Sequence, residues 1–232
     1  MNRRHRMAAL LLGGALLAGG CGPSDDEPRG RDTGAADDRL KEVAISDLKT
    51  GVGEYMPPLD EGRIELALPE GWKFLSRHAD YIVRFYHADP NSLPRILVTV
   101  EEPTWVETPT VSRENVEDFA RHVARQLDES GTQLIEPVKP MIIGPTPCAR
   151  YVAAGKHHDV AVERQVLQTQ LADRVYTIEL QVFAGTILQY RDAGYAVAAS
   201  LRPAASAKPD DSNDESGQSP SDTAATARED AN

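Results

Sequence analysis

Two long polar stretches, residues 21–60 and 204–232, confine the core of the folded part of this 232-residue chain to the region between them. Residues 21–60 are rich in Gly, Pro, Asp and Arg and predict a flexible tether, in which a short helix can form over 39–48. Residues 204–232 contain no apolar residue larger than Ala, which predicts a disordered acidic tail. The stretch 61–203 is close to the commonest domain size, so we expect one folded domain there.

Hydrophobic patterning within this domain predicts a series of strands. Apolar and polar residues alternate over 64–68, and Pro69 ends that strand. The turn at 171–173 joins the last two predicted strands as a pair. The further strands are predicted over 81–86, 96–100, 141–143, 149–155, 160–170 and 174–183.

Two helices are predicted from apolar residues at helical spacing. The first follows Ser112, which has the character of an N-cap, and ends at Gly131. Its apolar stripe consists of Val116, Phe119, Ala120, Val123 and Leu127. The second starts near Gly185 and ends at Pro203, with a stripe of Ile187, Tyr190, Gly194, Val197 and Leu201. This order of elements predicts an α+β fold with a mainly antiparallel sheet and two main helices.

Residues 1–20 have the three parts of an export signal. Residues 2–6 are basic, residues 7–18 form an apolar run, and small residues precede Cys21. The run is too short for a bilayer, which needs about 20 apolar residues. We therefore expect residues 1–20 to be a signal peptide.

The Gly19-Gly20-Cys21 ending resembles the lipobox of bacterial lipoproteins. In that family the cysteine thiol is joined to diacylglycerol, the signal is cut before the cysteine, and the new amino group is acylated with chains such as palmitate. One departure is that Leu17 lies four residues before Cys21 rather than three. The resemblance implies lipidation at Cys21 and stable anchoring, since more than one acyl chain would be attached.

The same resemblance implies a location. The domain would face the periplasm or the exterior, and Gly22, a non-acidic residue after the cysteine, favours the outer membrane. The alternative is an ordinary secretory signal with an incidental cysteine, which would leave an unanchored periplasmic binding module.

The middle of the chain resembles the PsbP/DcrB-like group. The resemblance rests on the "LPEGW" turn at 68–72, the long helix after the third strand, and the late paired strands that lead to a helix ending at 199–201. It implies an α/β/α sandwich over 61–203 and an accessory or binding role, with no shared catalytic residues. It also implies that Trp72 packs inward.

Composition excludes several classes of function. A formal net charge of −11 disfavours nucleic acid as a partner. The 2 cysteines cannot build a disulfide scaffold or a thiolate zinc site. The chain has no P-loop, dinucleotide glycine pattern, HExxH or GxSxG motif, so we expect no cofactor and no catalytic residues. After signal cleavage Cys148 would be the one thiol left, and we expect it to be a buried small hydrophobe.

The sharpest local cluster is His157-His158-Asp159, between two predicted strands. These groups could bind zinc, copper or nickel. Adjacent residues of an extended chain point to opposite faces, however, so the two imidazoles should not chelate one ion without help from elsewhere. That help would have to come from His78, His87 or His122. We expect solvated turn residues and no metal site.

Trp105 lies in the connection Pro103-Thr104-Trp105-Val106. An exposed tryptophan there could contact a partner. A ring that folds back over the sheet edge is an equal alternative.

Together these patterns lead us to expect a lipid-anchored envelope protein with a noncatalytic binding or accessory role. Its partner would be the membrane, through the anchor, and an envelope protein or small ligand. The alternative is an envelope metal-binding protein or enzyme that uses His157, His158 and Asp159. A thiol enzyme built on Cys148 and one of these histidines is a weaker alternative.

Overall fold

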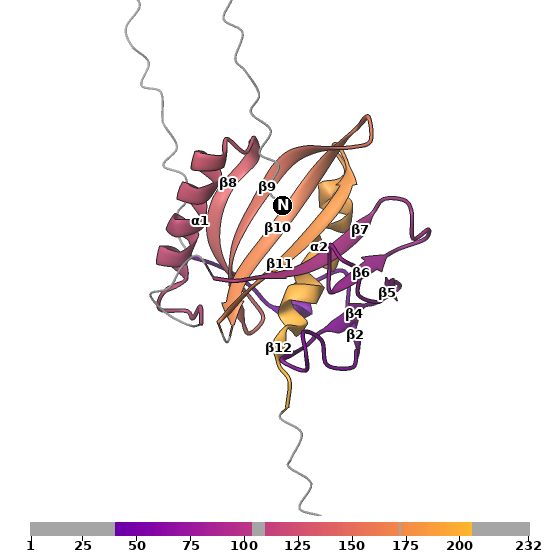
Figure 1. The fold of residues 1–232 in the computed structure, drawn as a ribbon, viewed down its shortest axis with the longest axis horizontal. Helices are drawn as coiled ribbons and strands as arrows, with labels where there is room; N and C mark the ends of the chain where they lie inside the picture. Colours follow the sequence, from indigo (N-terminus) through magenta and orange to yellow (C-terminus); the bar gives the residue numbers. More distant parts are fainter. Residues whose placement is uncertain (1–39, 104–109, 172, 206–232) are drawn as a thin grey trace, which may run out of the picture. The chain divides into compact units, whose positions relative to one another are not determined.

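The computed structural model describes residues 40–103, 110–171 and 173–205. These residues form an eight-stranded sheet, two two-stranded sheets and two α-helices (Figure 1). The large sheet has the strand order β1-β8-β9-β10-β11-β7-β6-β5. Its neighbouring strands are antiparallel, apart from β1, which runs parallel to β8.

The elements have the following bounds. The large sheet contains β1 (Lys41–Val43), β5 (Lys73–Leu75), β6 (Val83–Tyr86), β7 (Arg95–Glu101), β8 (Leu134–Ile143), β9 (Thr146–His157), β10 (Val160–Leu171) and β11 (Arg174–Phe183). The small sheets pair β2 (Val52–Tyr55) with β4 (Ala67–Pro69) and β3 (Ile64–Glu65) with β12 (Arg202–Pro203). The helices are α1 (Val116–Ser130), α2 (Ile187–Ser200) and the 3-10 helix η1 (Ile45–Asp47).

The two α-helices pack against opposite faces of the large sheet. Cys148 of β9 and Leu167 of β10 belong to the core that contains α2, whereas Ala149 and Val166 belong to the core that contains α1. Because successive residues of a strand point to opposite faces, this alternation places one helix on each side. The structure therefore confirms the predicted α+β class and the α/β/α layering.

We call the sheet face toward α2 the filled face. Its side chains are almost fully buried, and they include Phe85, Ile96, Val98, Leu167, Ile178 and Leu180. The opposite face, which we call the open face, carries α1 over β8 and β9. On β6, β7, β10 and β11 the open face presents half-buried polar residues, among them Arg84, Arg95, Arg164, Glu179 and Gln181.

The helix α1 has the predicted apolar stripe and the predicted end. Gly131 adopts the left-handed conformation with φ 68°, and its N–H donates to the carbonyls of Leu127 and Asp128. Ser112 is not the N-cap: the helix begins at Val116, and Asn115 occupies the cap position. Ser112 instead starts the preceding turn, in which its backbone N–H donates to Asn115 Oδ1 at 2.7 Å.

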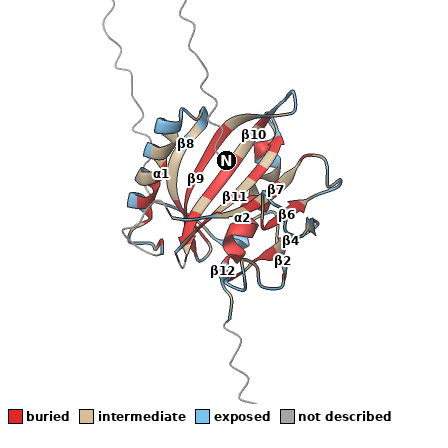
Figure 2. Ribbon diagram, in the orientation of Figure 1, coloured by how far each residue is buried: buried red, intermediate tan, exposed pale blue. Residues whose placement is uncertain are grey.

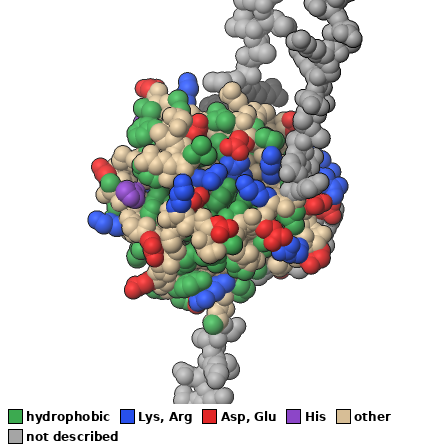
Figure 3. Space-filling model, turned by 180° about the vertical axis from the view of Figure 1, so that it is seen from behind, with side chains coloured by type: hydrophobic (Ala, Val, Ile, Leu, Met, Phe, Trp, Pro, Cys, Tyr) green, Lys and Arg blue, Asp and Glu red, His purple; other side chains and the backbone are tan. Residues whose placement is uncertain are grey.

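The helix α2 is buried on more than the predicted single stripe. Every residue from Ala193 to Ser200 is buried (Figure 2). The cause is the N-terminal part of the domain, because α2 contacts the large sheet on one side and β2 and β4 on the other. Figure 3 shows the molecule from behind the view of Figure 1, and acidic, basic and apolar side chains are mixed on this surface.

The folded unit begins well before the predicted boundary at residue 61. β1 pairs with β8, and β2 pairs with β4. Residues 40–60 are therefore part of the domain and not of a tether. In place of the helix predicted over 39–48, the structure has the strand β1 and the 3-10 helix η1. Strand pairing is a long-range interaction, which composition alone does not reveal. The predicted signal peptide, most of the predicted tether and most of the predicted tail lie outside the described residues.

The strand predicted over 64–68 is split between two small sheets. Leu66 and Ala67 are both buried, which breaks the alternation, so that β3 pairs with β12 and β4 pairs with β2. The strand β8 is longer than predicted, and β1 covers it only at residues 141–143. No helix among the described residues has the length and apolar character needed to cross a membrane.

Candidate functional site

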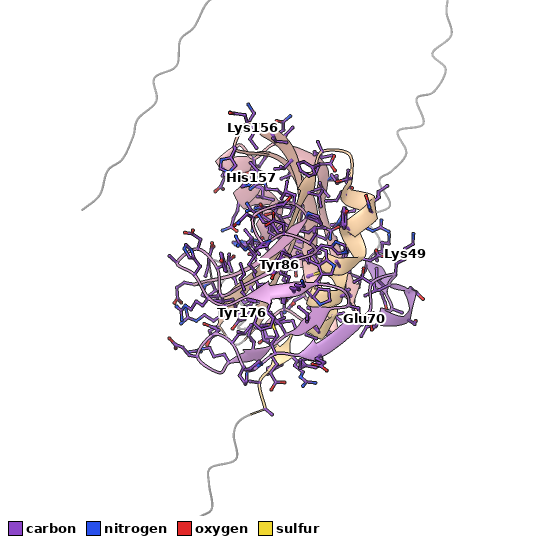
Figure 4. All side chains as sticks on the ribbon, turned by 90° about the vertical axis from the view of Figure 1, so that its right-hand side faces the viewer. Lys49, Glu70, Tyr86, Lys156, His157 and Tyr176 are labelled. Carbon is purple, nitrogen blue, oxygen red and sulfur yellow. The ribbon has the colours of Figure 1, made fainter. Side chains whose placement is uncertain are left out.

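The predicted histidine cluster lies at the tip of the hairpin formed by β9 and β10. Figure 4 shows Lys156 and His157 at one end of the domain, far from Lys49 and Glu70. His158 has a φ of 52°, which is a turn conformation. This turn brings the rings of His157 and His158 to a centroid distance of 4.4 Å. The expectation that the two imidazoles point apart is therefore wrong, because the chain is not extended at His158.

One of the two imidazoles, that of His157, is nevertheless hydrogen-bonded to the protein. Arg95 Nη2 donates to Nδ1 of His157 at 3.2 Å. Burial, the Arg95 charge and His158 together hold the pKa of His157 below its ordinary value. A guanidinium at this distance repels a metal ion, and no group of three or more His, Cys, Asp or Glu side chains suited to a metal occurs in the described ranges.

Arg95 connects this hairpin tip to the open face of the sheet. Strand register places Arg95 directly opposite Gln181, and Gln181 directly opposite Arg164. In the next row, Arg84 is opposite Leu97, and Leu97 is opposite Glu179. Because neighbouring strands lie about 5 Å apart, these two rows bring three arginines from three strands onto one patch.

We call Arg84, Arg95 and Arg164 the arginine cluster. Arg95 Nε donates to Gln181 Oε1 at 2.8 Å, and Arg164 Nη2 donates to the Ala154 carbonyl at 3.4 Å. The Arg84 guanidinium lies 5.4 Å from the centre of the Tyr81 ring. Within the described ranges, the one carboxylate in contact with the cluster is that of Glu179, 4.0 Å from Arg164 Nη1. That carboxylate accepts a shorter bond, of 2.6 Å, from Gln181.

Arg150, on the filled face, differs from the arginine cluster because its charge is paired with a carboxylate. Arg150 is 7% exposed in its side chain and donates to Glu136. This hydrogen bond holds the pKa of the Glu136 carboxyl below its ordinary value. An arginine buried against the core is thus neutralised, whereas the arginine cluster is left with an excess of positive charge.

Cys148 is 1% exposed on the filled face, which bears out its expected role as a small buried hydrophobe. Burial raises its pKa to about 12, so the thiolate needed for nucleophilic chemistry does not form near neutral pH. The weaker alternative of a thiol enzyme built on Cys148 has no support in this geometry.

Three candidates from the sequence remain: Trp72, Cys21 and Trp105. Trp72 is 5% exposed and belongs to the core, as the resemblance implied. Cys21 and Trp105 both lie outside the described residues, so lipidation at the first and a partner contact at the second stay predictions.

A hollow of about 290 Å³ lies beside the open face, between residues 77–82 and the end of β7. His78 and Asp80 form a pair in it at 3.4 Å, but their side chains are 61% and 84% exposed. A pair this exposed is solvated and is not held in one geometry for proton transfer.

The arginine cluster is the site that the sequence patterns did not reveal. Its members belong to three separate strands, so no local motif contains them. All three strands were predicted, over 81–86, 96–100 and 160–170, but only Arg84 stands between two apolar residues, Val83 and Phe85, so the sequence contains no shared signal for the cluster.

Comparison with known proteins gives likenesses in fold only. No family model matches the chain, and no curated protein matches it. A crystal structure from Bacteroides thetaiotaomicron has a TM-score of 0.45 and 13% identity over 67% of this chain, which spans 50% of that protein.

For two further structures, the similarity extends over nearly the whole of the matched protein. LpqN, a protein involved in cell envelope biogenesis of Mycobacterium tuberculosis, has a TM-score of 0.44 and 16% identity over 69% of this chain and 95% of its own. The cyanobacterial PsbP of Synechocystis has a TM-score of 0.36 and 15% identity over 66% and 94%. The structures to which this chain is similar thus include a PsbP protein, and we assign no family from these scores.

Proposed function

We propose that this chain is a lipid-anchored protein of the cell envelope, with a noncatalytic role in which the open face of its sheet binds a ligand or partner. The anchor would be Cys21, and the outer membrane is the favoured location. One observation carries the anchoring: a basic segment, a short apolar run and small residues directly precede Cys21. The likeness to LpqN is compatible with an accessory envelope role, but the proposal does not depend on it.

The geometry of the domain supports binding over catalysis. The described residues of the open face offer hydrogen-bond donors and positive charge, whereas Cys148, the described thiol, is buried on the other face. A hydrolytic or transfer reaction needs a nucleophile, a base and a group that orients the base within hydrogen-bond reach. The histidine nearest the arginine cluster, His157, is bonded to an arginine rather than to a carboxylate.

Metabolic labelling with radioactive palmitate in a bacterial host tests the anchor. We expect the wild-type chain and a Cys148→Ala control to carry label and to sediment with membranes. The Cys21→Ala variant should carry none and should appear in the soluble fraction. An unlabelled wild-type chain, or label that persists in Cys21→Ala, would contradict the proposal.

Metal analysis of the purified chain tests the rival function. We expect less than stoichiometric zinc, copper and nickel, both in the wild type and in a His157→Ala/His158→Ala double variant. Stoichiometric metal that the double variant loses would replace the noncatalytic role by that of a metal-binding protein or metalloenzyme.

A further inference from the structure

The arginine cluster carries more positive charge than the protein around it neutralises. In the part of the chain that the structure describes, three guanidinium groups face one carboxylate, that of Glu179, and the contact of 4.0 Å is longer than a hydrogen bond. The local balance is therefore about +2, in a chain whose formal net charge is −11. An excess of this sign, on an acidic protein, is what electrostatic selection of an anionic ligand requires.

Most of the other arginines in the described part are paired with a carboxylate. Six of them contact a carboxylate at 3.4 Å or less: Arg113, Arg121, Arg150, Arg174, Arg191 and Arg202. No such contact is found for Arg84 or Arg95 among the described residues. In this cluster the chain instead surrounds the guanidinium groups with neutral partners, such as Gln181, His157 and the Ala154 carbonyl.

Two donors of the cluster are buried without a protein acceptor. Nε of Arg84 and Nε of Arg164, like Nε of Arg150 on the filled face, have almost no accessible surface and no hydrogen-bond partner in the described structure. A buried unpaired donor costs free energy, and more so when it is charged. The chain bears this cost at two of the three arginines of the cluster.

The backbone makes room for one of these side chains. Arg164 crosses the position where residue 155 would carry a Cβ, and a Cβ built on Gly155 would lie 3.0 Å from Arg164 Nε. Gly155 therefore lets the guanidinium lie close to the sheet. Burial and the charge of Arg84 both lower the pKa of Arg95, whereas the charge of Glu179 raises it.

We propose that the arginine cluster binds a doubly charged oxyanion, such as the phosphate group of a soluble phosphate compound or of a lipid headgroup. Planar guanidinium groups match the oxygen geometry of phosphate and can donate two parallel hydrogen bonds each. The charge of a phosphate dianion equals the local excess. The proposal rests on the proposed function in taking the open face as the binding surface, but it does not depend on the anchor at Cys21.

Calorimetric titration of the purified full chain with inorganic phosphate tests the shared chemistry. We expect saturable one-to-one binding that weakens as salt is added, since the contact is charge with charge. Arg84→Gln, Arg95→Gln and Arg164→Gln should each lower the affinity about tenfold, the effect of losing a hydrogen bond to a charged group. Arg121→Gln, which removes the same charge from an exposed helix position, should leave the affinity unchanged.

Two further variants separate binding from folding. Glu179→Gln keeps the shape of the side chain but raises the local charge by one, so phosphate should bind more tightly, by about threefold. Gly155→Ala displaces Arg164 without removing its charge, so phosphate should bind more weakly while circular dichroism stays that of the wild type. Equal affinities in the wild type, Glu179→Gln and the arginine variants would mean that phosphate binds elsewhere and would overturn the proposal.

Flotation with phosphatidylcholine vesicles, with and without phosphatidate, distinguishes the source of the phosphate. Binding to phosphatidate vesicles that inorganic phosphate displaces indicates a lipid headgroup, whereas binding of inorganic phosphate alone indicates a soluble ligand. If neither probe binds, the proposal is wrong. The outcome of palmitate labelling at Cys21 does not depend on this result, so failure here is distinct from failure of the proposed anchor.

Discussion

The two faces of the large sheet are built from the same strands and have opposite properties. On the filled face, β7, β10 and β11 present Val98, Leu167 and Leu180, each almost fully buried against α2. On the open face the residues directly next to them in the chain include Thr99, Gln168 and Glu179, which are half-buried and polar. A single strand can thus supply stability with every second residue and leave the others free for binding.

Energetics explain why this division is tolerated. Full burial of one Leu, Ile, Val or Phe side chain contributes about 1.5–3 kcal/mol. The filled face and α2 contain many such side chains, so the core does not need the open face over β7 and β11. The arginine cluster can then keep its buried, unpaired donors without unfolding the domain.

The largest test of this difference is the same truncation made on each face. Leu180→Ala should lower the free energy of unfolding by about 2–5 kcal/mol, because it leaves a cavity under α2. Leu97→Ala, on the open face of the neighbouring strand, should cost about 1 kcal/mol, since Leu97 is only half-buried. Urea denaturation measures both. Equal losses would show that the two faces contribute alike to stability.

The next largest effect concerns the one ion pair of the filled face described above. Glu136→Gln should cost about 2 kcal/mol, because it leaves the buried Arg150 charge without its carboxylate. The value is set below that of a fully buried pair because Glu136 is itself 41% exposed. Glu114→Gln, which alters an exposed carboxylate on the turn before α1, is the matched control and should be close to neutral.

The same pair predicts a dependence of stability on pH. The pKa of Glu136 is lowered by Arg150, so its contribution is fully present above its ordinary value of 4.5 and is lost as the pH falls through the lower, folded-state value. Stability measured from pH 6 downward should therefore fall less steeply for Glu136→Gln than for the wild type. Parallel curves would mean that Arg150 does not depend on this carboxylate.

A smaller effect, of opposite sign, is expected on the open face. In phosphate-free buffer, Arg84→Gln should change the free energy of unfolding by no more than about 0.5 kcal/mol, toward greater stability, because it relieves repulsion with Arg95. Thermal denaturation followed by circular dichroism measures the change. A loss as large as that of Glu136→Gln would show that the cluster is structural, and the contrast between the faces would fail.

The smallest expected signal is the absence of a reaction. Cys148 is buried on the filled face and its pKa is raised to about 12, so in a Cys21→Ser variant no thiol should react with Ellman's reagent at pH 8. One thiol per chain should react once urea unfolds the protein. Rapid reaction without urea would mean that the filled face opens readily.

The elements that short sequence patterns specify were predicted correctly. The late strands β10 and β11 were predicted to within a residue or so, because a short turn and β-forming residues mark them. The apolar stripe of α1 was also correct, because one face of that helix is solvent-exposed. The α2 stripe was too narrow, because its second covering comes from β2 and β4, which lie far away in the sequence.

The candidate site could not be predicted for the same reason. Arg84, Arg95 and Arg164 meet only after β7 and β11 are paired in one particular register, and register is a property of the whole sheet. The histidine cluster was visible as a motif, but the turn at His158 that brings its ring beside His157 was not. The histidine cluster was therefore recognisable in the sequence, whereas the arginine cluster exists only in the folded sheet.

The short overlap between β1 and β8 has a consequence for how copies of the protein meet one another. Residues 134–140 of β8 have no strand beside them on the β1 side among the described residues. The unpaired backbone groups of an exposed strand edge can pair with a strand of a second molecule, and this pairing leads to aggregation. Pro137 and Pro140 fall within that edge, and neither has an N–H to donate. The protein therefore carries its own safeguard against polymerising at this edge, which matters for molecules that would be crowded side by side.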